Sequence, residues 1–272
     1  MAPGKHIVAV IGAGKIGELV LSGLLRAGWP AGKLLATARR QDRGAYLTER
    51  YGIRVVDNAA AVVEADVLAV AVKPQDAATL FDEIGAKVPA DKLIISLCAG
   101  LPTSFFTHRL PEGTPVVRVM TNTPALVDEA MTAISAGPYA TREHLALAEE
   151  MFTPLGATIR VPESQQDAVT ALSGSGPAYF YLLVEAMIDA GILLGLPRQV
   201  AHELIVQTAI GSAVMLRDSG EHPVKLREAV TSPAGTTISA IRELENHGVR
   251  AALLSALEAA RDRAREIATQ NA

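Results

Sequence analysis

Near the start of the chain lies the stretch Ile7-Val8-Ala9-Val10-Ile11-Gly12-Ala13-Gly14-Lys15-Ile16-Gly17, an apolar run followed by a Gly-x-Gly-x-x-Gly turn. The run predicts a buried parallel strand, and the apolar periodicity from Leu19 to Leu25 predicts a helix after the turn. The first glycine permits a tight turn, the second lets a diphosphate approach the backbone, and the third allows close helix packing. We therefore expect a dinucleotide site formed by Gly12, Ala13, Gly14, Lys15, Ile16 and Gly17. The alternative is a glycine-rich turn that binds nothing.

The composition favours α/β layers and helix bundles over an aromatic-rich β-sandwich. Of the 272 residues, 49% are hydrophobic but only 4% are aromatic, which leaves enough apolar surface for one large or two medium cores. The formal net charge of −4 gives no global field that would attract nucleic acid or an anionic membrane. We therefore expect neither as a partner.

Cysteine and histidine usage predicts a metal-free protein of a reducing compartment. Cys98 is the single cysteine, so neither an internal disulfide nor a cysteine metal cluster can form, and the six histidines show no metal-ligand spacing. The apolar stretch 178–196 is interrupted by Glu185 and Asp189, which predicts a buried helix rather than a membrane span. The first strand begins too early to leave room for a signal peptide. We expect a cytoplasmic location.

Strand and helix patterns alternate through the first half of the chain. Further strands are expected at 34–37, 53–56, 66–72, 93–97, 116–120, 131–135 and 157–161, with helices at 42–50, 58–64 and 141–152. This alternation predicts a doubly wound sheet of about seven or eight strands that can include antiparallel edges at its end.

An arginine pair follows the second expected strand. An NAD-binding chain carries an acid about 20 residues past the glycines to hold the ribose 2′-hydroxyl. Here the sequence reads Thr37-Ala38-Arg39-Arg40-Gln41, with no acid before Asp42. Guanidinium groups bind phosphate as a fork, so Thr37, Arg39 and Arg40 are expected at the adenosine end of NADP. The alternative is a solvated charged turn.

Two further strand ends are expected at the cofactor edge, because ligands of open parallel sheets bind beyond the carboxyl ends of strands. Lys73-Pro74 follows the strand at 66–72, although a lysine before a helix-starting proline is often only a surface residue. Cys98-Ala99-Gly100 follows the strand at 93–97, where small residues leave room for a nicotinamide ring. No histidine near Cys98 in the sequence suggests activation, which favours a packing role over a nucleophile.

The strand pattern stops near Pro162, which divides the chain into expected domains 1–162 and 163–272. The second domain is predicted to be all-helical, with helices near 164–172, 177–194, 198–217 and 249–269 and a break at 173–177. A short helix is expected after the break at 218–223, up to residue 230, and a further helix is expected to end near residue 246. The helix at 177–194 is apolar nearly all round, and a domain of about 110 residues cannot bury it alone. A homodimer through these helices is therefore expected.

A hydroxyl-rich loop, Thr231-Ser232-Pro233-Ala234-Gly235-Thr236-Thr237, opens a helix that is expected to end near Asn246. Free N–H groups and hydroxyl donors converge at such a helix N-terminus and suit a carboxylate or phosphate. Plain helix capping is the alternative.

Six segments taken together resemble the pyrroline-5-carboxylate reductases, enzymes of the last step of proline biosynthesis. They are the glycine turn, Ala71-Val72-Lys73-Pro74, Met120-Thr121-Asn122-Thr123-Pro124, Leu172-Ser173-Gly174-Ser175-Gly176-Pro177-Ala178-Tyr179, Gly195-Leu196-Pro197-Arg198, and 229–237. The glycine turn is shared with many dehydrogenases, whereas the Ser-Gly-Ser-Gly-Pro and Thr-Ser-Pro-x-Gly-x-Thr segments are specific. The segments occur in the family's order and span essentially the whole chain.

The resemblance implies a Rossmann-type doubly wound sheet followed by an all-helical dimerisation domain. It implies NAD(P)H-dependent reduction of the cyclic imine 1-pyrroline-5-carboxylate to L-proline, with dimers that assemble into a decamer. The arginine pair favours NADPH as the reductant over NADH. Cofactor contacts carried over by motif are Asn58, Ala71, Val72, Lys73, Pro74, Cys98, Ala99 and Gly100. Substrate contacts carried over are Glu163, Ser232, Gly235, Thr236 and Thr237, with the Thr237 hydroxyl at the ring nitrogen as the catalytic group.

Two positions depart from the family pattern. Ala234 stands where many members carry glycine, and Ala229 replaces an asparagine found near the cofactor in some members, so that contact is not carried over.

Three other functions compete with the reductase. A β-hydroxyacid dehydrogenase needs a lysine acid in its helical domain, where only Lys225 is present. The remaining two are a reductase of a related cyclic imine and a non-catalytic NADP-sensing dimer.

Overall fold

The computed structural model describes residues 4–271 of the chain. By internal packing these divide into two compact units, one of residues up to Ser175 together with those from Ala259, and the other of residues Gly176–Glu258. Residues 163–175 belong to the first unit, where Glu163 contacts Thr103 and Gln166 contacts Ser135 through side-chain hydrogen bonds. The functional boundary after residue 162 stays a prediction.

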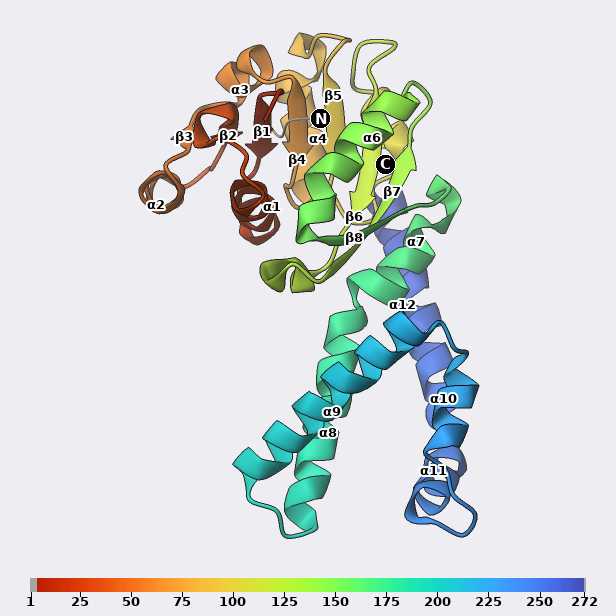
Figure 1. Cartoon of the computed structure of the whole chain (residues 1–272). Coiled ribbons are helices and arrows are strands. Elements are labelled where there is room, and N and C mark those ends of the chain that lie inside the picture. Colours follow the sequence, from red (N-terminus) through yellow and green to blue (C-terminus); the bar gives the residue numbers. More distant parts are fainter. Residues whose placement is uncertain (1–3, 272) are drawn as a thin grey trace. The chain divides into compact units, whose positions relative to one another are not determined.

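The first unit is built on a sheet that has eight strands within the described residues (Figure 1). The strands are β1 (Val8–Ile11), β2 (Leu34–Ala36), β3 (Arg54–Val55), β4 (Val67–Val70), β5 (Leu93–Ser96), β6 (Val116–Met120), β7 (Ala130–Ala136) and β8 (Gly156–Arg160). Their order is β3-β2-β1-β4-β5-β6-β7-β8. The pairs from β3 to β6 are parallel, β7 runs antiparallel to β6, and β8 runs parallel to β7. The expected doubly wound sheet with antiparallel pairing towards its end is confirmed.

The helices of the sheet unit cover both faces of the sheet. They are α1 (Lys15–Arg26), α2 (Gln41–Tyr51), α3 (Asn58–Glu64), α4 (Pro74–Ile84), α5 (Thr103–Thr107), α6 (Arg142–Phe152) and α7 (Gln166–Val169). Alternate residues of β1 point to opposite faces: Val8 and Val10 join the core under α1, α2 and α6, whereas Ala9 and Ile11 join the core under α3, α4 and α5. This two-sided burial explains why the strands are almost continuously apolar.

The strand order reverses direction at β1, which places a topological switch point there. The chain runs outward from β1 to β2 and β3, and then crosses to the other side of β1 with β4. Open sheets of this kind bind ligands beyond the carboxyl ends of the strands at such a point. The glycine turn follows β1, so the fold puts it at this location.

The second unit is helical and contains α8 (Gly176–Leu193), α9 (Arg198–Ser219), α10 (Pro223–Ala229) and α11 (Thr236–Asn246). A final helix, α12 (Val249–Asn271), begins in this unit, and its residues from Ala259 belong to the sheet unit. Gly195 has a φ of +94°, a left-handed conformation typical of the residue after a helix, so α8 ends close to the residue 194 expected from the sequence.

The break expected at residues 173–177 is wrong. Thr170–Gly174 form a π-helical turn, in which the amide of Ser175 donates to the carbonyl of Thr170 over 2.9 Å. Ser175 keeps helical dihedral angles, so the chain passes from α7 into α8 with only a local widening. Glycine and proline can enter a helix here because the widened turn and the first position of α8 do not need every amide.

As expected for a helix that its own domain cannot bury, the helix at 177–194 is not covered within a single chain. No residue of α8 is buried, and Leu193 is 87% exposed. By length and composition, the helical run Glu163–Leu193 is the one candidate among the described residues for crossing a membrane. That criterion alone is weak, because helices that are covered by another protein surface meet it equally.

Candidate active site

The glycine turn after β1 has the geometry that its sequence predicted. Gly12 has a φ of +80°, and a Cβ built there would lie 2.5 Å from Cγ1 of Val72. A Cβ on Gly17 would lie 2.9 Å from Cγ1 of Val10, so this glycine does permit close packing of α1 on β1. A Cβ on Gly14 would meet only the carbonyl of Gly12, at 4.0 Å. The backbone at Gly14 is therefore open to an incoming group.

The N-terminus of α1 is available to an anion. Gly14 is its N-cap residue and supplies no side-chain hydrogen bond, and both Gly14 and Lys15 are exposed. The first amides of a helix have no partner within the helix and carry its partial positive charge. Together with the open backbone at Gly14, these amides fit the diphosphate of a dinucleotide.

Thr37 lies directly against the glycine turn. Its hydroxyl accepts a hydrogen bond from the amide of Gly12 over 3.1 Å, and its carbonyl accepts one from the amide of Ala13 over 2.8 Å. Thr37 is buried, so its hydroxyl holds the turn instead of facing solvent.

The two arginines after β2 have different partners. Arg39 Nη2 donates to Oδ2 of Asp76 over 2.9 Å, and its side chain is 82% exposed. Arg40 donates to both carboxylate oxygens of Asp42, two residues away, with Nε at 2.9 Å from Oδ1 and with Nη2 on Oδ2. The guanidinium of Arg40 is thus already paired with the Asp42 carboxylate, whereas that of Arg39 contacts the first turn of α4.

The ends of β4 and β5 adjoin the turn from the other side. Ala71 and Val72 pack against the positions of Gly17 and Gly12, while Lys73 is the exposed N-cap residue of α4 and Pro74 is its first residue. Asn58 begins α3, and its amide nitrogen lies 3.4 Å from both carboxylate oxygens of Glu83.

Cys98 is a packing residue in this structure. It is 2% exposed, and its Sγ lies 3.4 Å from the carbonyl oxygen of Val72. Burial raises the pKa of this thiol to about 12, which removes the thiolate that a nucleophile needs. The next residues form a tight bend, where Gly100 has a φ of +78° and a Cβ would lie 3.0 Å from Cγ2 of Ile267. The small size of Gly100 thus makes room for α12.

The contacts that Arg43 makes with the glycine turn could not be predicted from sequence patterns. Its Nε donates to the carbonyl of Ala13 over 3.0 Å and its Nη2 to that of Gly14 over 3.1 Å. The same guanidinium pairs with Glu18 in the first turn of α1. Arg43 lies on α2, so only the packing of α2 beside α1 brings these groups together.

The Glu18 carboxylate accepts hydrogen bonds from three side chains of α2, one of which is Arg43. The Tyr51 hydroxyl donates to it over 2.8 Å and the Tyr46 hydroxyl over 3.0 Å. Burial acts to raise the pKa of Glu18, but the hydrogen bonds from Arg43, Tyr51 and Tyr46 outweigh it, so the pKa lies below its ordinary value.

Glu163 is held by the sheet unit. Its Oε1 accepts from the amide of Thr103 and its Oε2 from the hydroxyl of Thr103, both over 2.6 Å. Nη1 of Arg118, which is 5% exposed, lies 3.6 Å from Oε1, and Nη2 of Arg118 lies 3.4 Å from Asp167. Both oxygens of Glu163 therefore have protein partners.

The hydroxyl-rich loop forms a tight turn at the N-terminus of α11. The amide of Gly235 donates to the carbonyl of Ser232 over 3.1 Å, and Ala234 between them has a φ of +57°. Proline at the second position and a positive φ at the third are typical of a type II turn. A Cβ on Gly235 would lie 3.1 Å from the Ser232 carbonyl oxygen and would displace the Ser232 hydroxyl, so glycine lets this hydroxyl lie close to the backbone.

The N-terminus of α11 has no side-chain cap, although three hydroxyl residues lie beside it. Gly235 is its N-cap residue, and no side chain bonds to its first amides. The Ser239 hydroxyl instead donates to the carbonyl of Gly235 over 3.2 Å, and the Thr231 hydroxyl donates to that of Arg227 over 2.6 Å. Plain capping is therefore not what the hydroxyls of this loop do.

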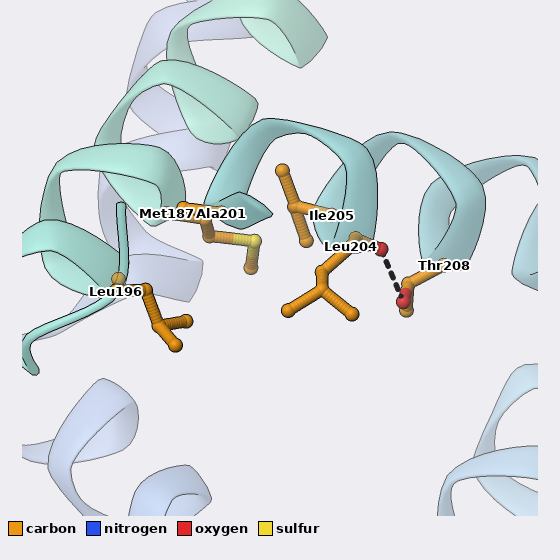
Figure 2. A pocket seen from close by; sticks show the side chains of 7 residues that line it. Met187, Leu196, Ala201, Leu204, Ile205 and Thr208 are labelled. Carbon is orange, nitrogen blue, oxygen red and sulfur yellow. Dashed lines mark hydrogen bonds between the residues drawn. The ribbon is translucent and has the colours of Figure 1, made fainter. Parts of the chain in front are cut away.

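A shallow hollow between α8 and α9 is apolar and unsuited to a charged substrate. Figure 2 shows its lining by Met187, Leu196, Ala201, Leu204, Ile205 and Thr208. The single hydroxyl, on Thr208, donates to the carbonyl of Leu204 over 2.8 Å, so it is already satisfied. No group of three or more histidine, cysteine or acidic side chains suited to a metal ion occurs among residues 4–271.

Comparison with protein families divides the chain into two matching regions. Residues 7–100 match a family model described as NADP oxidoreductase, coenzyme F420-dependent, and residues 163–267 match one described as pyrroline-5-carboxylate reductase dimerisation. The second model covers the apolar run Glu163–Leu193, and its description as a dimerisation domain supports a homodimer.

Relatives match over nearly the full length. The chain is 42% identical to a pyrroline-5-carboxylate reductase of Mycobacterium tuberculosis (97% of both chains), and 38% identical to one of Arabidopsis thaliana (96% and 95%). A solved reductase from Coxiella burnetii superposes with a TM-score of 0.87 at 34% identity (96% and 98% covered). A Plasmodium falciparum pyrroline carboxylate reductase with NADP bound superposes with 0.90 at 26% identity (98% and 100%). The chain belongs to the pyrroline-5-carboxylate reductase family.

Proposed function

We propose that this chain carries out the reaction of its family with two open helix N-termini as binding sites. The N-terminus of α1 would bind the diphosphate of the cofactor, and that of α11 would bind the carboxylate of the substrate. The family's reaction is the reduction of 1-pyrroline-5-carboxylate to proline with NAD(P)H, and the chain is an oxidoreductase with NADP as its cofactor. The observation that carries the proposal is the uncapped N-terminus of α11, bordered by Ser232, Thr236 and Thr237.

The cofactor is proposed to bind along the carboxyl ends of β1, β2, β4 and β5. The amides of Lys15, Ile16 and Gly17 would hold its diphosphate beside Gly14, whose own amide donates to the Gly12 carbonyl but where a Cβ would meet only that carbonyl, at 4.0 Å. Arg39, with Arg40 nearby, would hold the 2′-phosphate of NADP, because a guanidinium binds phosphate as a fork. The remaining proposed cofactor contacts are Gly12, Ala13, Thr37, Asn58, Ala71, Val72, Lys73, Pro74, Cys98, Ala99 and Gly100.

The substrate carboxylate is proposed to bind at α11. Amides of Gly235, Thr236 and Thr237 and the hydroxyl of Ser232 can donate to it, and the helix end favours a negative charge. The Thr237 hydroxyl would hydrogen-bond the ring nitrogen and help it to keep its proton. Glu163, whose oxygens are engaged by Thr103 and Arg118, would act as a fixed negative charge on the substrate side.

The main task of the protein in this reaction is to orient the imine carbon towards the nicotinamide. When bound, the reduced nicotinamide supplies the hydride that adds to the imine carbon. A protonated imine already accepts hydride well, so Thr237 needs only to position the nitrogen. No strong general acid is required of this chain.

Replacement of Thr237 tests this proposal. We expect Thr237→Ala to lower kcat/KM for 1-pyrroline-5-carboxylate by about 10- to 1000-fold, the range for one lost transition-state hydrogen bond. Thr237→Ser keeps the hydroxyl and should retain most of the activity. Binding of NADP+ by Thr237→Ala should stay unchanged. Wild-type kinetics in Thr237→Ala would remove Thr237 from the mechanism.

The reductase dimerisation domain supports a homodimer. We further propose that dimers assemble into a decamer and that the enzyme is cytoplasmic, where its lone buried cysteine stays a thiol. Light scattering after size-exclusion chromatography tests the assembly: a mass of ten chains supports the decamer, and a mass of two chains at micromolar concentration contradicts it.

A further inference from the structure

Asp76 brings a carboxylate to the arginine that is proposed to bind the 2′-phosphate. Its Oδ2 lies 2.9 Å from Nη2 of Arg39. Asp76 is in the first turn of α4, after β4, whereas Arg39 follows β2. In the sheet, β2 and β4 are the two neighbours of β1. The ion pair therefore joins the elements on both sides of the glycine turn.

This carboxylate supplies a feature that the sequence near β2 lacks. Sheets that bind NAD place an acid after β2 to accept from the ribose 2′-hydroxyl. Residues 37–41 contain no acid here, and Asp42 is occupied by Arg40. Asp76 lies 37 residues further along the chain but contacts Arg39 directly. The acid missing from the local sequence thus comes from a different strand–helix junction.

Arg39 retains donors for a second partner. The hydrogen bond to Asp76 uses one terminal nitrogen, and a guanidinium has five N–H donors in a planar fork. The side chain is 82% exposed, so the rest of the fork faces solvent. A phosphate bound there would lie on one side of the guanidinium with the Asp76 carboxylate on another.

We propose that Asp76 is a specificity-determining residue that restrains the preference for NADP over NAD. The proposal rests on the binding of the 2′-phosphate by Arg39. With NADP, the carboxylate repels the doubly charged phosphate that shares its arginine. With NAD, the same carboxylate accepts a hydrogen bond from the 2′-hydroxyl. One ion pair thereby serves both cofactors.

Two effects of removing the carboxylate oppose each other, and their sizes decide the sign. A charge of −1 about 6 Å from a charge of −2 weakens binding by about tenfold in water, and by about threefold once salt screens it. Loss of an exposed ion pair that positions Arg39 costs at most a factor of about five, and many such pairs contribute nothing measurable. At low salt the repulsion, worth about tenfold, exceeds this loss, so there the neutral variant Asp76→Asn should bind NADP+ more tightly.

Binding titrations on the full-length enzyme without substrate test the proposal. Dissociation constants for NADP+ and NAD+ are measured by calorimetry for the wild type, Asp76→Asn, Arg39→Ala and Arg40→Ala. Asp82→Asn, on the same helix, is the charge-matched control. We expect Asp76→Asn to shift selectivity towards NADP+ by about 10- to 100-fold, from tighter NADP+ and weaker NAD+ binding. The gain for NADP+ should shrink as salt is raised, and Asp82→Asn should match the wild type.

The other variants separate this proposal from the one on which it rests. Arg39→Ala should shift selectivity towards NAD+, whereas Arg40→Ala should have a smaller effect because Asp42 already holds its fork. Unchanged selectivity in Arg39→Ala overturns the phosphate site and this proposal with it. A shift in Arg39→Ala with none in Asp76→Asn overturns the role of Asp76 alone. A shift of Asp76→Asn towards NAD+ likewise overturns it, because Asp76 would then only position Arg39.

Discussion

The guanidinium of Arg43 lies 3.1 Å from the carbonyl oxygen of Gly14 and ties α2 to the turn between β1 and α1. Because the same side chain also bonds the Ala13 carbonyl and Glu18, it fixes three points around the proposed diphosphate site. These bonds hold the turn's carbonyls towards α2, which leaves the amides at the start of α1 free for an anion. The shape of the site thus depends on a residue outside the glycine motif.

Replacement of Arg43 by lysine should weaken cofactor binding without removing the positive charge. An ammonium cannot bond both carbonyls and Glu18 with the planar geometry of the guanidinium. We expect the dissociation constant of NADP+ to rise by about 5- to 20-fold for Arg43→Lys, as two hydrogen bonds are lost. Arg142→Lys, an exposed position on α6, is the control and should bind normally. Equal affinity in both variants would show that Arg43 does not shape the turn.

Gly14→Ala should weaken the binding of NADP+ without changing the stability of the folded protein. A Cβ at Gly14 meets nothing closer than 4.0 Å, so the apo-protein should unfold at the wild-type temperature. The same Cβ would occupy the space where a diphosphate approaches, and the affinity for NADP+ should fall at least about tenfold. Gly32→Ala, where a Cβ also meets open space, should alter neither property. Normal NADP+ binding by Gly14→Ala would move the diphosphate away from this glycine.

The Glu18 cluster predicts a pH-dependent contribution to stability. Its folded-state pKa lies below the ordinary 4.5, because its hydrogen bonds outweigh burial. A depressed pKa contributes stability that is fully present above the unfolded value and is lost as pH falls through the folded value. Glu18→Gln should therefore lower the free energy of unfolding by about 1–2 kcal/mol at pH 7, and by less as pH falls below 4.5.

Urea unfolding at a series of pH values measures this difference. Glu49→Gln, an exposed position on α2, should differ little from the wild type throughout. A Glu18→Gln difference that stays constant from pH 7 down to about pH 2 would mean that the ionised carboxylate contributes nothing beyond packing.

Replacement of Ala234 by glycine should raise the free energy of unfolding of the protein. Its φ of +57° lies in the left-handed region, which costs an alanine about 1–2 kcal/mol. Glycine removes this cost but gives the unfolded chain more freedom, worth about 0.4–1 kcal/mol, so Ala234→Gly should gain about 0.5–1 kcal/mol. Ala240→Gly, inside α11, should instead lose about 1 kcal/mol. Denaturant titration measures both, and destabilisation by Ala234→Gly would contradict the strain.

Local sequence patterns predicted most of the elements of this protein. Apolar runs of four or five residues became strands because both faces of a parallel sheet are buried, and the glycines at 12 and 17 are required by backbone geometry and close packing. The hydroxyl-rich loop before α11 was equally visible, although the tight turn at residues 232–235 was found only in the structure. Such features depend on neighbours in the chain, and the sequence records them directly.

The errors came where local signals conflicted with the surrounding structure. Glycines and a proline at 173–177 predicted a break, but a π-helical turn absorbs them. There the side chain of Met120 fills the space beside Gly174, and Asn122 donates to the Ser173 carbonyl over 3.2 Å. Such packing joins two motifs about 50 residues apart, and no periodicity could predict it.

By itself, then, the sequence determined the strand–helix alternation, the glycine turn, the arginine pair and the hydroxyl-rich loop, because each is set by residues close together in the chain. Only the tertiary structure decided which partners these groups have. It placed Asp76 on Arg39, Asp42 on Arg40, Thr103 on Glu163 and Arg43 on the turn. Hydrogen bonds and ion pairs act over about 3 Å in space, whatever the separation in sequence. The strand order around β1 therefore controls the electrostatics of the proposed cofactor site.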